Sequence, residues 1–243
     1  MTNNDLYKES FKSLVLEGIE KDTEIYKYIG TGNPNSKILI VGKEGACENP
    51  PEGEICFAKH WLPKIENNES ISFKKFYNPP LREGETWNKY QKLHDYIFSE
   101  FKEKRENNEI NFEERIFTTE MNTNRSKRAK DAPKVGMQER KYTFFKESEF
   151  IQQFPVIILA CGDYLKNNDK KTEIEDIFGV TFKPDGRKYP KEETPNRQAF
   201  WTHYNPDKTK LVIHTRQLSS NVSNELLFEM ANVIKEHLNK LNL

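Results

Sequence analysis

Several short segments of the chain are almost continuously apolar, and longer stretches with helical spacing separate them. Residues 37–41, 156–160 and 210–214 have the sequences KILIV, VIILA and KLVIH. Apolar runs of this length are typical of buried strands, and the lack of polar alternation indicates strands covered on both faces of a sheet. A further short strand is predicted at RIFTT, residues 115–119.

Amphipathic segments connect these strands, with apolar residues three or four positions apart. Residues 45–85 and 163–199 are polar or rich in turn-forming residues and are predicted to form long loops. The segments 199–204 and 210–215 flank the turn NPDK and predict a hairpin. The predicted helices span residues 5–28, 86–101, 143–154 and roughly the last 20 residues.

Strands that alternate with helices indicate βαβ units with helices on both faces of a sheet. The chain has 243 residues, a length that one domain with a substantial core can occupy. The sequence therefore predicts a single α/β domain over residues 1–243. Its expected architecture is a three-layer α/β/α sandwich around a mostly parallel sheet of about four strands.

The net charge and the cysteine content limit which partners and which cellular location we expect for the protein. Lys plus Arg and Asp plus Glu each total 38, so the net charge is zero and any nucleic-acid surface must be local. The three cysteines have no zinc-ligand spacing, and no apolar stretch is long enough to cross a membrane. We expect a cytoplasmic, reduced, monomeric protein without a membrane contact, a metal or another cofactor.

Common catalytic motifs are absent from the sequence. There is no phosphate-binding GxxxxGK[ST] loop and no GxSxG elbow. The GTG at residues 30–32 precedes its strand and is predicted to be a turn. Cys161 ends an apolar strand, where a buried thiol is a better interpretation than a nucleophile.

Polar residues follow each predicted strand, and this placement directs attention to one edge of the sheet. Ligands of parallel α/β sheets bind beyond the carboxyl ends of the strands. We therefore expect Glu44 and His214 to lie at a shared cleft there. The segments that follow the strands are 42–44, 120–124, 162–164 and 214–219.

Two of these strand ends carry a resemblance to a known family. Gly42-Lys43-Glu44 is followed at a fixed distance by Cys56-Phe57, and the last strand ends with His214, Leu218 and Ser219 in the order His-x-x-x-Leu-Ser. This arrangement resembles the uracil-DNA glycosylase superfamily, in element order over most of the chain. The resemblance implies the same α/β fold and a metal-independent hydrolysis of the N-glycosidic bond of a damaged or deaminated DNA base.

The resemblance also implies roles for individual residues. Glu44 would stabilise the oxocarbenium-like sugar and activate water, and His214 would donate a hydrogen bond to the departing base. Phe57 would stack on the extruded base, and Glu120 or Asn122 would contact its polar edge. Three of these residues have a structural alternative: Glu44 as a loop carboxylate, His214 as a satisfied histidine and Phe57 as a core phenylalanine.

A second set of residues would contact DNA, which we expect to be single-stranded or to carry a lesion. Leu218 is the candidate wedge for the gap left by the base, or else the first core contact of the last helix. Ser219 is predicted near the start of that helix, where backbone amides favour a phosphate or where a serine simply caps the helix. The phosphate-facing candidates are Ser219, Arg216, Arg125 and Arg128, the last two from the basic run 124–134, which is predicted to be a mobile surface loop.

Departures from the family pattern favour two alternatives. Gly45-Ala46 replaces the usual proline and aromatic residue, and Thr215-Arg216 replaces Pro-Ser. The first alternative is a nucleic-acid or nucleotide-binding module without catalysis, and the second is an unrelated α/β hydrolase of small molecules. Glu120 is acceptor-only when ionised, so we predict poor excision of uracil and a preference for another lesion or none.

Overall fold

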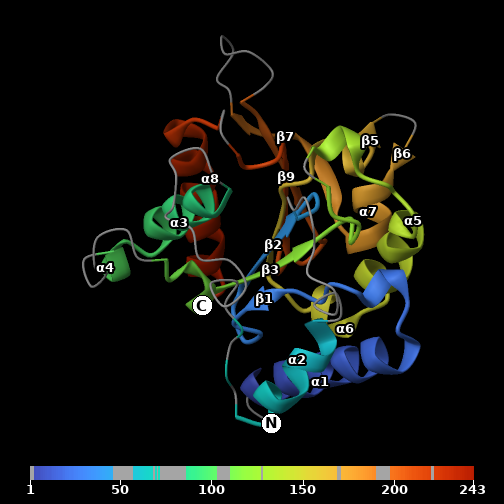
Figure 1. The fold of residues 1–243 in the computed structure, drawn as a ribbon. Coiled ribbons are helices and arrows are strands. Elements are labelled where there is room, and N and C mark those ends of the chain that lie inside the picture. The colour runs from blue at the N-terminus through green and yellow to red at the C-terminus, as the bar shows by residue number, and fades with distance from the viewer. Residues whose placement is uncertain are drawn as a thin grey trace.

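A mixed sheet of seven strands forms the centre of the computed structural model (Figure 1). The strand order is β1-β3-β2-β4-β9-β8-β7. The structure describes residues 3–45, 57–67, 69, 71, 86–102, 110–126, 128–168, 171–189, 198–219 and 222–243.

Four parallel strands occupy the middle of this sheet. Each consists almost wholly of buried residues, as strands covered on both faces require. The register aligns Gly42 with Glu120, and Leu159 with His214, so the carboxyl ends of neighbouring strands lie at the same level. The four strands are β3 (Ile116–Glu120), β2 (Ile38–Gly42), β4 (Val156–Leu159) and β9 (Leu211–Thr215).

Antiparallel strands extend the sheet on both sides and correct the prediction of about four mostly parallel strands. β1 (Thr31–Gly32) pairs with β3, and β8 (Phe200–Tyr204) pairs with β9 as the predicted hairpin. β7 (Thr181–Tyr189) then pairs with β8, so parallel and antiparallel pairings are equally numerous within the described part of this sheet. β1 is too short and β7 too polar to give an apolar signature, which is why the pattern alone missed them.

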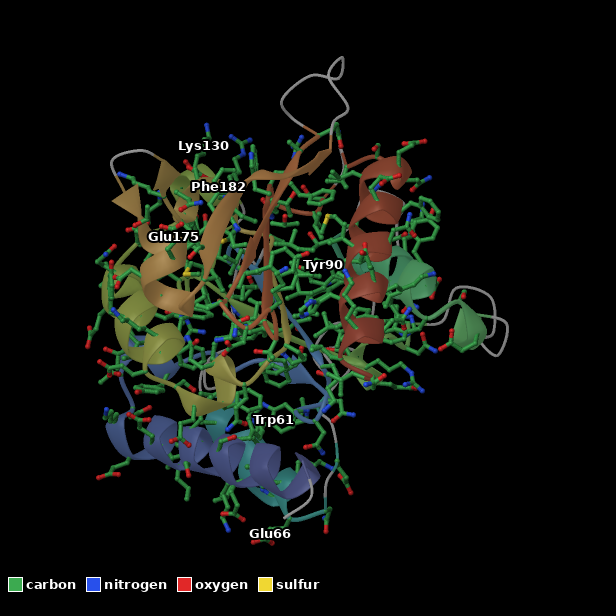
Figure 2. The ribbon with its side chains drawn as sticks, turned by 180° about the vertical axis from the view of Figure 1, so that it is seen from behind. Trp61, Glu66, Tyr90, Lys130, Glu175 and Phe182 are labelled. Carbon is green, nitrogen blue, oxygen red and sulfur yellow. The ribbon has the colours of Figure 1, made fainter. Side chains whose placement is uncertain are left out.

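One face of the sheet carries an aromatic core beneath α1 (Asn3–Lys21) and α2 (Phe57–Ile65). Phe11 and Trp61 meet edge to face with ring centroids 4.8 Å apart, and both rings pack near Phe117 of β3. The buried indole nitrogen of Trp61 donates to the carbonyl of Gly30 at 2.9 Å, which anchors α2 to the chain before β1 (Figure 2). The smaller α7 (Glu173–Phe178) contributes Ile174, Ile177 and Phe178 to the same core.

The opposite face is covered by α3 (Thr86–Ile97) and α8 (Asn224–Lys240), which pack against each other (Figure 1). Tyr90 and Leu93 of α3 and Met230 and Ile234 of α8 belong to a second buried cluster with the strands. The short α4 (Ser99–Lys102) follows α3. Helices on both faces make the described chain an α/β fold with three layers.

Two helix predictions need correction. The segment 143–154 is not one helix: α5 (Met137–Arg140) leads into the π-helical turn η5 (Lys141–Lys146), and α6 (Glu149–Gln152) starts anew. The reason is Ser148, whose side chain accepts from the amide of Ile151 and caps a new helix. The first helix ends at Lys21 rather than residue 28, because Asp22 adopts a positive φ of 42°.

The region predicted as a polar loop at 163–199 also contains secondary structure. Besides α7 and β7, a two-stranded ribbon is formed by β5 (Asn167–Asn168) and β6 (Lys171–Thr172). Across the ranges that the structure describes, no helix combines the length and the apolar character that crossing a bilayer requires.

Candidate functional site

The backbone brings the ends of β2 and β3 together at the carboxyl edge of the sheet. The amide of Met121 donates to the carbonyl of Gly42 at 2.9 Å, and the amide of Asn122 donates to that of Lys43 at 2.8 Å. These two hydrogen bonds hold the segments after β2 and β3 together beyond the last paired residues, and Glu44 lies two residues after β2 beside the segment after β3.

Glu44 is a buried carboxyl group in this edge, with only 8% of its surface exposed. The hydroxyl of Tyr164 donates a hydrogen bond to its Oε2 atom. Burial raises the pKa of Glu44, while the Tyr164 hydrogen bond and the ammonium groups of Lys43 and Lys134 act in the opposite direction. Glu44 is thus a desolvated carboxyl group with one strong donor, rather than a solvated loop residue.

Tyr164 ends the 3-10 turn η6 (Gly162–Tyr164) that follows β4. Its ring lies within reach of two cations: Lys43 Nζ is 4.6 Å and Lys134 Nζ is 4.8 Å from the ring centroid. Lys43 Nζ also donates to Asp163 Oδ1 at 2.6 Å. The turn after β4 therefore joins the Glu44 carboxyl to a local concentration of positive charge.

Glu120, the last residue of β3, places its carboxyl group over Gly42. A Cβ atom at Gly42 would overlap the Glu120 carboxyl in this position, so a larger residue there would displace that carboxyl group. Among the described residues, the buried Oε2 atom of Glu120 has no hydrogen-bond partner. Burial, and then the nearby charge of Glu44, raise the pKa of Glu120 to about 8, although Arg140 and Arg125 oppose the shift.

This pKa changes the premise of one sequence-based prediction. With a pKa of about 8, Glu120 is protonated at neutral pH. A neutral carboxylic acid offers one donor and one acceptor, whereas an ionised one offers acceptors only. The expectation that Glu120 cannot donate to a base carbonyl therefore no longer holds. The argument that the protein excises uracil poorly depended on that expectation.

Arg140 supports this edge from inside the protein, and sequence reasoning missed it. It is fully buried, and its guanidinium donates to the carbonyls of Glu120 at 3.0 Å and Tyr28 at 2.8 Å, and to that of Ile25. A further hydrogen bond reaches Thr119 Oγ1 at 3.1 Å. In the sequence Arg140 is one of many arginines on a polar stretch, and no local pattern distinguishes it.

His214 lies at the same edge of the sheet as Glu44, as predicted. Its hydrogen bond is with the turn after β4 rather than with Glu44. Its Nε2 atom is 2.9 Å from the carbonyl oxygen of Gly162, and since a carbonyl only accepts, Nε2 carries the proton and donates. Burial lowers the pKa of His214, so the ring is neutral and Nδ1 is an acceptor. In this arrangement the Nε2 donor expected for a departing base is already used.

Strand alternation separates His214 from Glu120. His214 is on the sheet face of Val212, which belongs to the core beneath α1, whereas Glu120 is on the face of Ile116, which belongs to the core beneath α3 and α8. Glu44 and His214 both contact the turn 162–164, which links them through Tyr164 and Gly162.

Asn122 is buried and holds the basic segment in place. Its Nδ2 donates to the carbonyl of Pro133 at 2.9 Å, and its Oδ1 accepts from the amide of Asn124 at 3.1 Å. Both polar atoms of the amide are therefore engaged within the protein. Of the two candidates for reading a base, Glu120 has the unpartnered polar atom and Asn122 does not.

The described residues of the basic segment 124–134 lie beside the carboxyl edge, the position expected from the sequence, while the expected mobility of the segment stays a prediction. The Nε atom of Arg125 would lie 3.5 Å from a Cβ on Gly45, and the amide of Ser126 donates to the Gly45 carbonyl at 3.3 Å. Arg128 and Lys134 are exposed, and within the described ranges neither forms an ion pair. The 3-10 turn η4 (Ala129–Asp131) gives this segment local order.

Leu218 and Ser219, the next two candidates for contacting DNA, have other positions than expected. Leu218 is fully buried in the core beneath α8, which corrects the expectation of a wedge and agrees with its alternative as a core contact. α8 starts after Ser223, whose side chain accepts from the Leu226 amide, so Ser219 does not cap it. The amide of Ser219 donates to the Gln217 carbonyl at 3.0 Å.

Arg216 and Phe57 complete the candidate set. The Cα atom of Arg216 would lie 3.8 Å from a Cβ on Gly162, which places this residue next to the turn that carries Tyr164. Phe57 begins α2, and its side chain lies outside the described part of the structure, as do Ala46 and Cys56.

Cys161, at the end of β4, has no role in the site that its chemistry would support. Cys161 is buried, and burial raises the pKa of its thiol to about 12, so it is not a thiolate nucleophile at neutral pH. In the described part of the chain, no three His, Cys, Asp or Glu side chains gather in a way that could hold a metal ion.

No family model, curated protein or solved structure matches the chain. The resemblance to the uracil-DNA glycosylase superfamily therefore stays a prediction.

Proposed function

We propose that the protein hydrolyses the N-glycosidic bond of a damaged or deaminated base in DNA, with Glu44 as the carboxylate beside the sugar. The observation that carries this proposal is the pair of carboxyl groups at the ends of β2 and β3. Burial raises the pKa of Glu44, but a donor and nearby cations oppose this shift and favour its charged form, whereas burial and then Glu44 raise the pKa of Glu120 to about 8. Two nearby carboxyl groups with such different surroundings suit acid and base roles in one reaction.

The chemistry follows from these two states. A carboxylate at Glu44 stabilises the positive charge that develops on the sugar and orients the attacking water. A neutral Glu120 can donate to the carbonyl of a departing base and accept from its ring N–H. Bases with such an amide edge include uracil, hypoxanthine and xanthine, so these are the proposed substrates.

The electrostatics of the edge support a polyanionic partner. The exposed Arg128 and Lys134, together with Arg125 and Arg216, lie on the segments that flank Glu44 and Gly162. In a chain with zero net charge, such a local surplus favours phosphates without requiring a basic protein.

The test is a panel of single- and double-stranded oligonucleotides that carry uracil, hypoxanthine, xanthine or oxidised bases, scored for abasic sites. Release of one of these bases by the wild-type protein, and its loss in Glu44→Gln, is the expected result. Glu17→Gln is the matched control, because Glu17 also accepts from a tyrosine hydroxyl but lies on α1. Absence of base release from every substrate overturns the proposal.

A second candidate is a DNA-binding module of the same fold that does not release a base. The contact between His214 Nε2 and the Gly162 carbonyl favours it, because the donor that would stabilise a departing base is occupied. For this candidate, the same oligonucleotides bind with a strong salt dependence and no abasic sites form.

A further inference from the structure

We propose that Tyr164 is a positioning residue for Glu44: its hydroxyl orients the carboxylate at the end of β2 and stabilises the charged form, and Lys43 and Lys134 flank its ring. The inference rests on the proposed function, since Glu44 is the carboxylate of the proposed reaction. It concerns a residue that no sequence motif singles out.

The geometry of Tyr164 is fixed by the turn that presents it. The residue follows β4 in η6, and its ring is 3% exposed within the core beneath α1. Gly162 opens this turn with a φ of 55°, a conformation that favours glycine. Because the ring is packed and the turn is short, the hydroxyl has one direction, and it is bonded to Glu44 Oε2.

The two ammonium groups lie over the ring and also act on the carboxylate. Lys43 Nζ and Lys134 Nζ are 4.6 Å and 4.8 Å from the ring centroid. Cations at this range interact with the π electrons of a phenol ring. Burial, and then Glu44, raise the pKa of Tyr164, so its hydroxyl keeps its proton and donates to Glu44, and hydrogen bonds to an ionised acceptor are the strong ones.

Among the described residues, the charged groups near Glu44 enter the same balance. Burial, together with Asp163, raises the pKa of Glu44, and the nearby Glu120 is neutral at neutral pH. The Tyr164 hydrogen bond is the foremost opposing influence, ahead of Lys43 and Lys134. Without the hydroxyl, Glu44 holds its proton to a higher pH, and the charged form needed beside the sugar becomes scarce.

The experiment titrates Glu44 directly, so it does not depend on enzyme activity. Glutamate labelled with ¹³C at the side-chain carboxyl carbon is introduced into the full chain, and the Glu44 signal is assigned by its loss in Glu44→Gln. In Tyr164→Phe, the titration midpoint of Glu44 should rise by about one pH unit, as expected for loss of a hydrogen bond to a charged group.

Two further variants make the result specific. Tyr26→Phe removes the hydroxyl that donates to Glu17 at 2.7 Å and should leave the Glu44 midpoint unchanged. Replacing Tyr164 by 3-fluorotyrosine keeps the ring and makes the hydroxyl more acidic, so the midpoint should fall. This substitution also serves as the test if Tyr164→Phe does not fold.

Activity provides the second readout where base release is observed. In Tyr164→Phe, the acid limb of kcat should move to higher pH with little change in KM, which a general loss of structure would not produce. An unchanged Glu44 midpoint in both Tyr164 variants overturns the inference, whether or not the protein releases a base. A shifted midpoint without any base release keeps the inference about Tyr164 and rejects the proposed function.

Discussion

Two places in the molecule combine a tyrosine, a glutamate and a lysine. Beside α1, the hydroxyl of Tyr26 donates to Glu17 at 2.7 Å, and Lys21 Nζ lies 5.5 Å from the Tyr26 ring centroid. At the carboxyl edge, Tyr164 donates to Glu44, and Lys43 Nζ lies 4.6 Å from its ring. Yet the pKa of Glu17 is lowered and that of Glu44 is raised.

The difference lies in solvent and in the partner of the ammonium group. Burial acts to raise the pKa of both glutamates, but the Glu17 side chain is exposed, whereas Glu44 is a buried residue. Lys21 donates to Glu17 directly at 2.6 Å, which together with Tyr26 outweighs burial, whereas Lys43 donates to Asp163 instead. The same residue types therefore form a surface ion pair in one place and a tuned, desolvated carboxyl group in the other.

The largest expected effect separates the two glutamates by activity. Glu44→Gln should lower the rate of base release by about 10²- to 10⁴-fold, the range for loss of a catalytic proton-transfer group. Glu17→Gln should leave the rate unchanged, since Glu17 lies on α1, away from the carboxyl edge. If the two variants lose the same amount of activity, measured by abasic-site formation, the difference between Glu44 and Glu17 has no bearing on function.

Arg140 connects the two regions, so its loss should weaken both. Its guanidinium binds the carbonyls of Ile25 and Tyr28, on either side of Tyr26, and the carbonyl of Glu120 at the site. Arg140→Met leaves these buried acceptors without donors and should lower the free energy of unfolding by about 3 kcal/mol or more. Urea denaturation measures the change.

The matched control for this variant is Arg128→Met, an exposed arginine on the neighbouring segment. Its effect should stay within about 0.5 kcal/mol. A loss below about 1 kcal/mol for Arg140→Met would show that water or rearrangement satisfies the carbonyls.

The change of stability with pH should have opposite signs for a carboxyl group with a raised pKa, such as Glu120, and for one with a lowered pKa, such as Glu17. The pKa of Glu120 is raised to about 8 in the folded protein, so the folded state holds a proton that the unfolded chain has lost between its ordinary pKa and about 8. This contribution makes the protein less stable as pH rises through that window, with a slope of at most about 1.4 kcal/mol per pH unit.

Glu120→Gln should flatten that slope, as measured by urea unfolding at several pH values. Glu17, whose pKa is lowered, acts the other way: its contribution is present at neutral pH and is lost as pH falls through its folded pKa. Glu17→Gln should therefore cost stability at neutral pH, by well under about 1 kcal/mol because the pair is exposed. If the slope of stability against pH in Glu120→Gln is the same as in the wild type, the slope comes from other titrating groups.

The smallest expected effect concerns the cations that surround the two regions. Around α1 the exposed Lys21 is paired with Glu17, whereas Arg128 and Lys134 have no ion-pair partner among the described residues. Arg128→Gln and Lys134→Gln should each reduce the salt slope of DNA binding by about 1, because each variant removes one cation that faces a phosphate. Lys146→Gln, which breaks an exposed pair with Asp176, should leave the slope unchanged.

The parallel centre of the fold was predictable because its signal is local. The apolar runs that became β2, β4 and β9 are buried on both faces, and a short apolar run conveys that directly. β7 and α7 were missed because a polar edge strand and a short helix lack such a run. Ser148 broke the helix predicted over 143–154, since a capping residue inside a periodic pattern outweighs the period.

The position of the site was predictable from the sequence, but the hydrogen bonds that connect its residues were not. Glu44, Glu120 and His214 could be located from strand ends, because parallel strands bring their carboxyl ends to one edge. Tyr164 and Arg140 were not identified, since their contacts join positions far apart in the chain. Protonation states depend on burial, which is why the neutral form of Glu120 appeared only with the structure.

The carbonyls that Arg140 holds also set the order in which the molecule can assemble. The bond from Arg140 to Ile25 spans 115 positions of the chain, and that to Tyr28 spans 112. Contacts between such distant positions require closure of a long loop and form late in folding. The carboxyl edge is therefore completed only when the N-terminal segment docks, and a chain lacking that segment would leave the Arg140 guanidinium beneath the site with only the acceptors of Thr119 and Glu120 among the described residues.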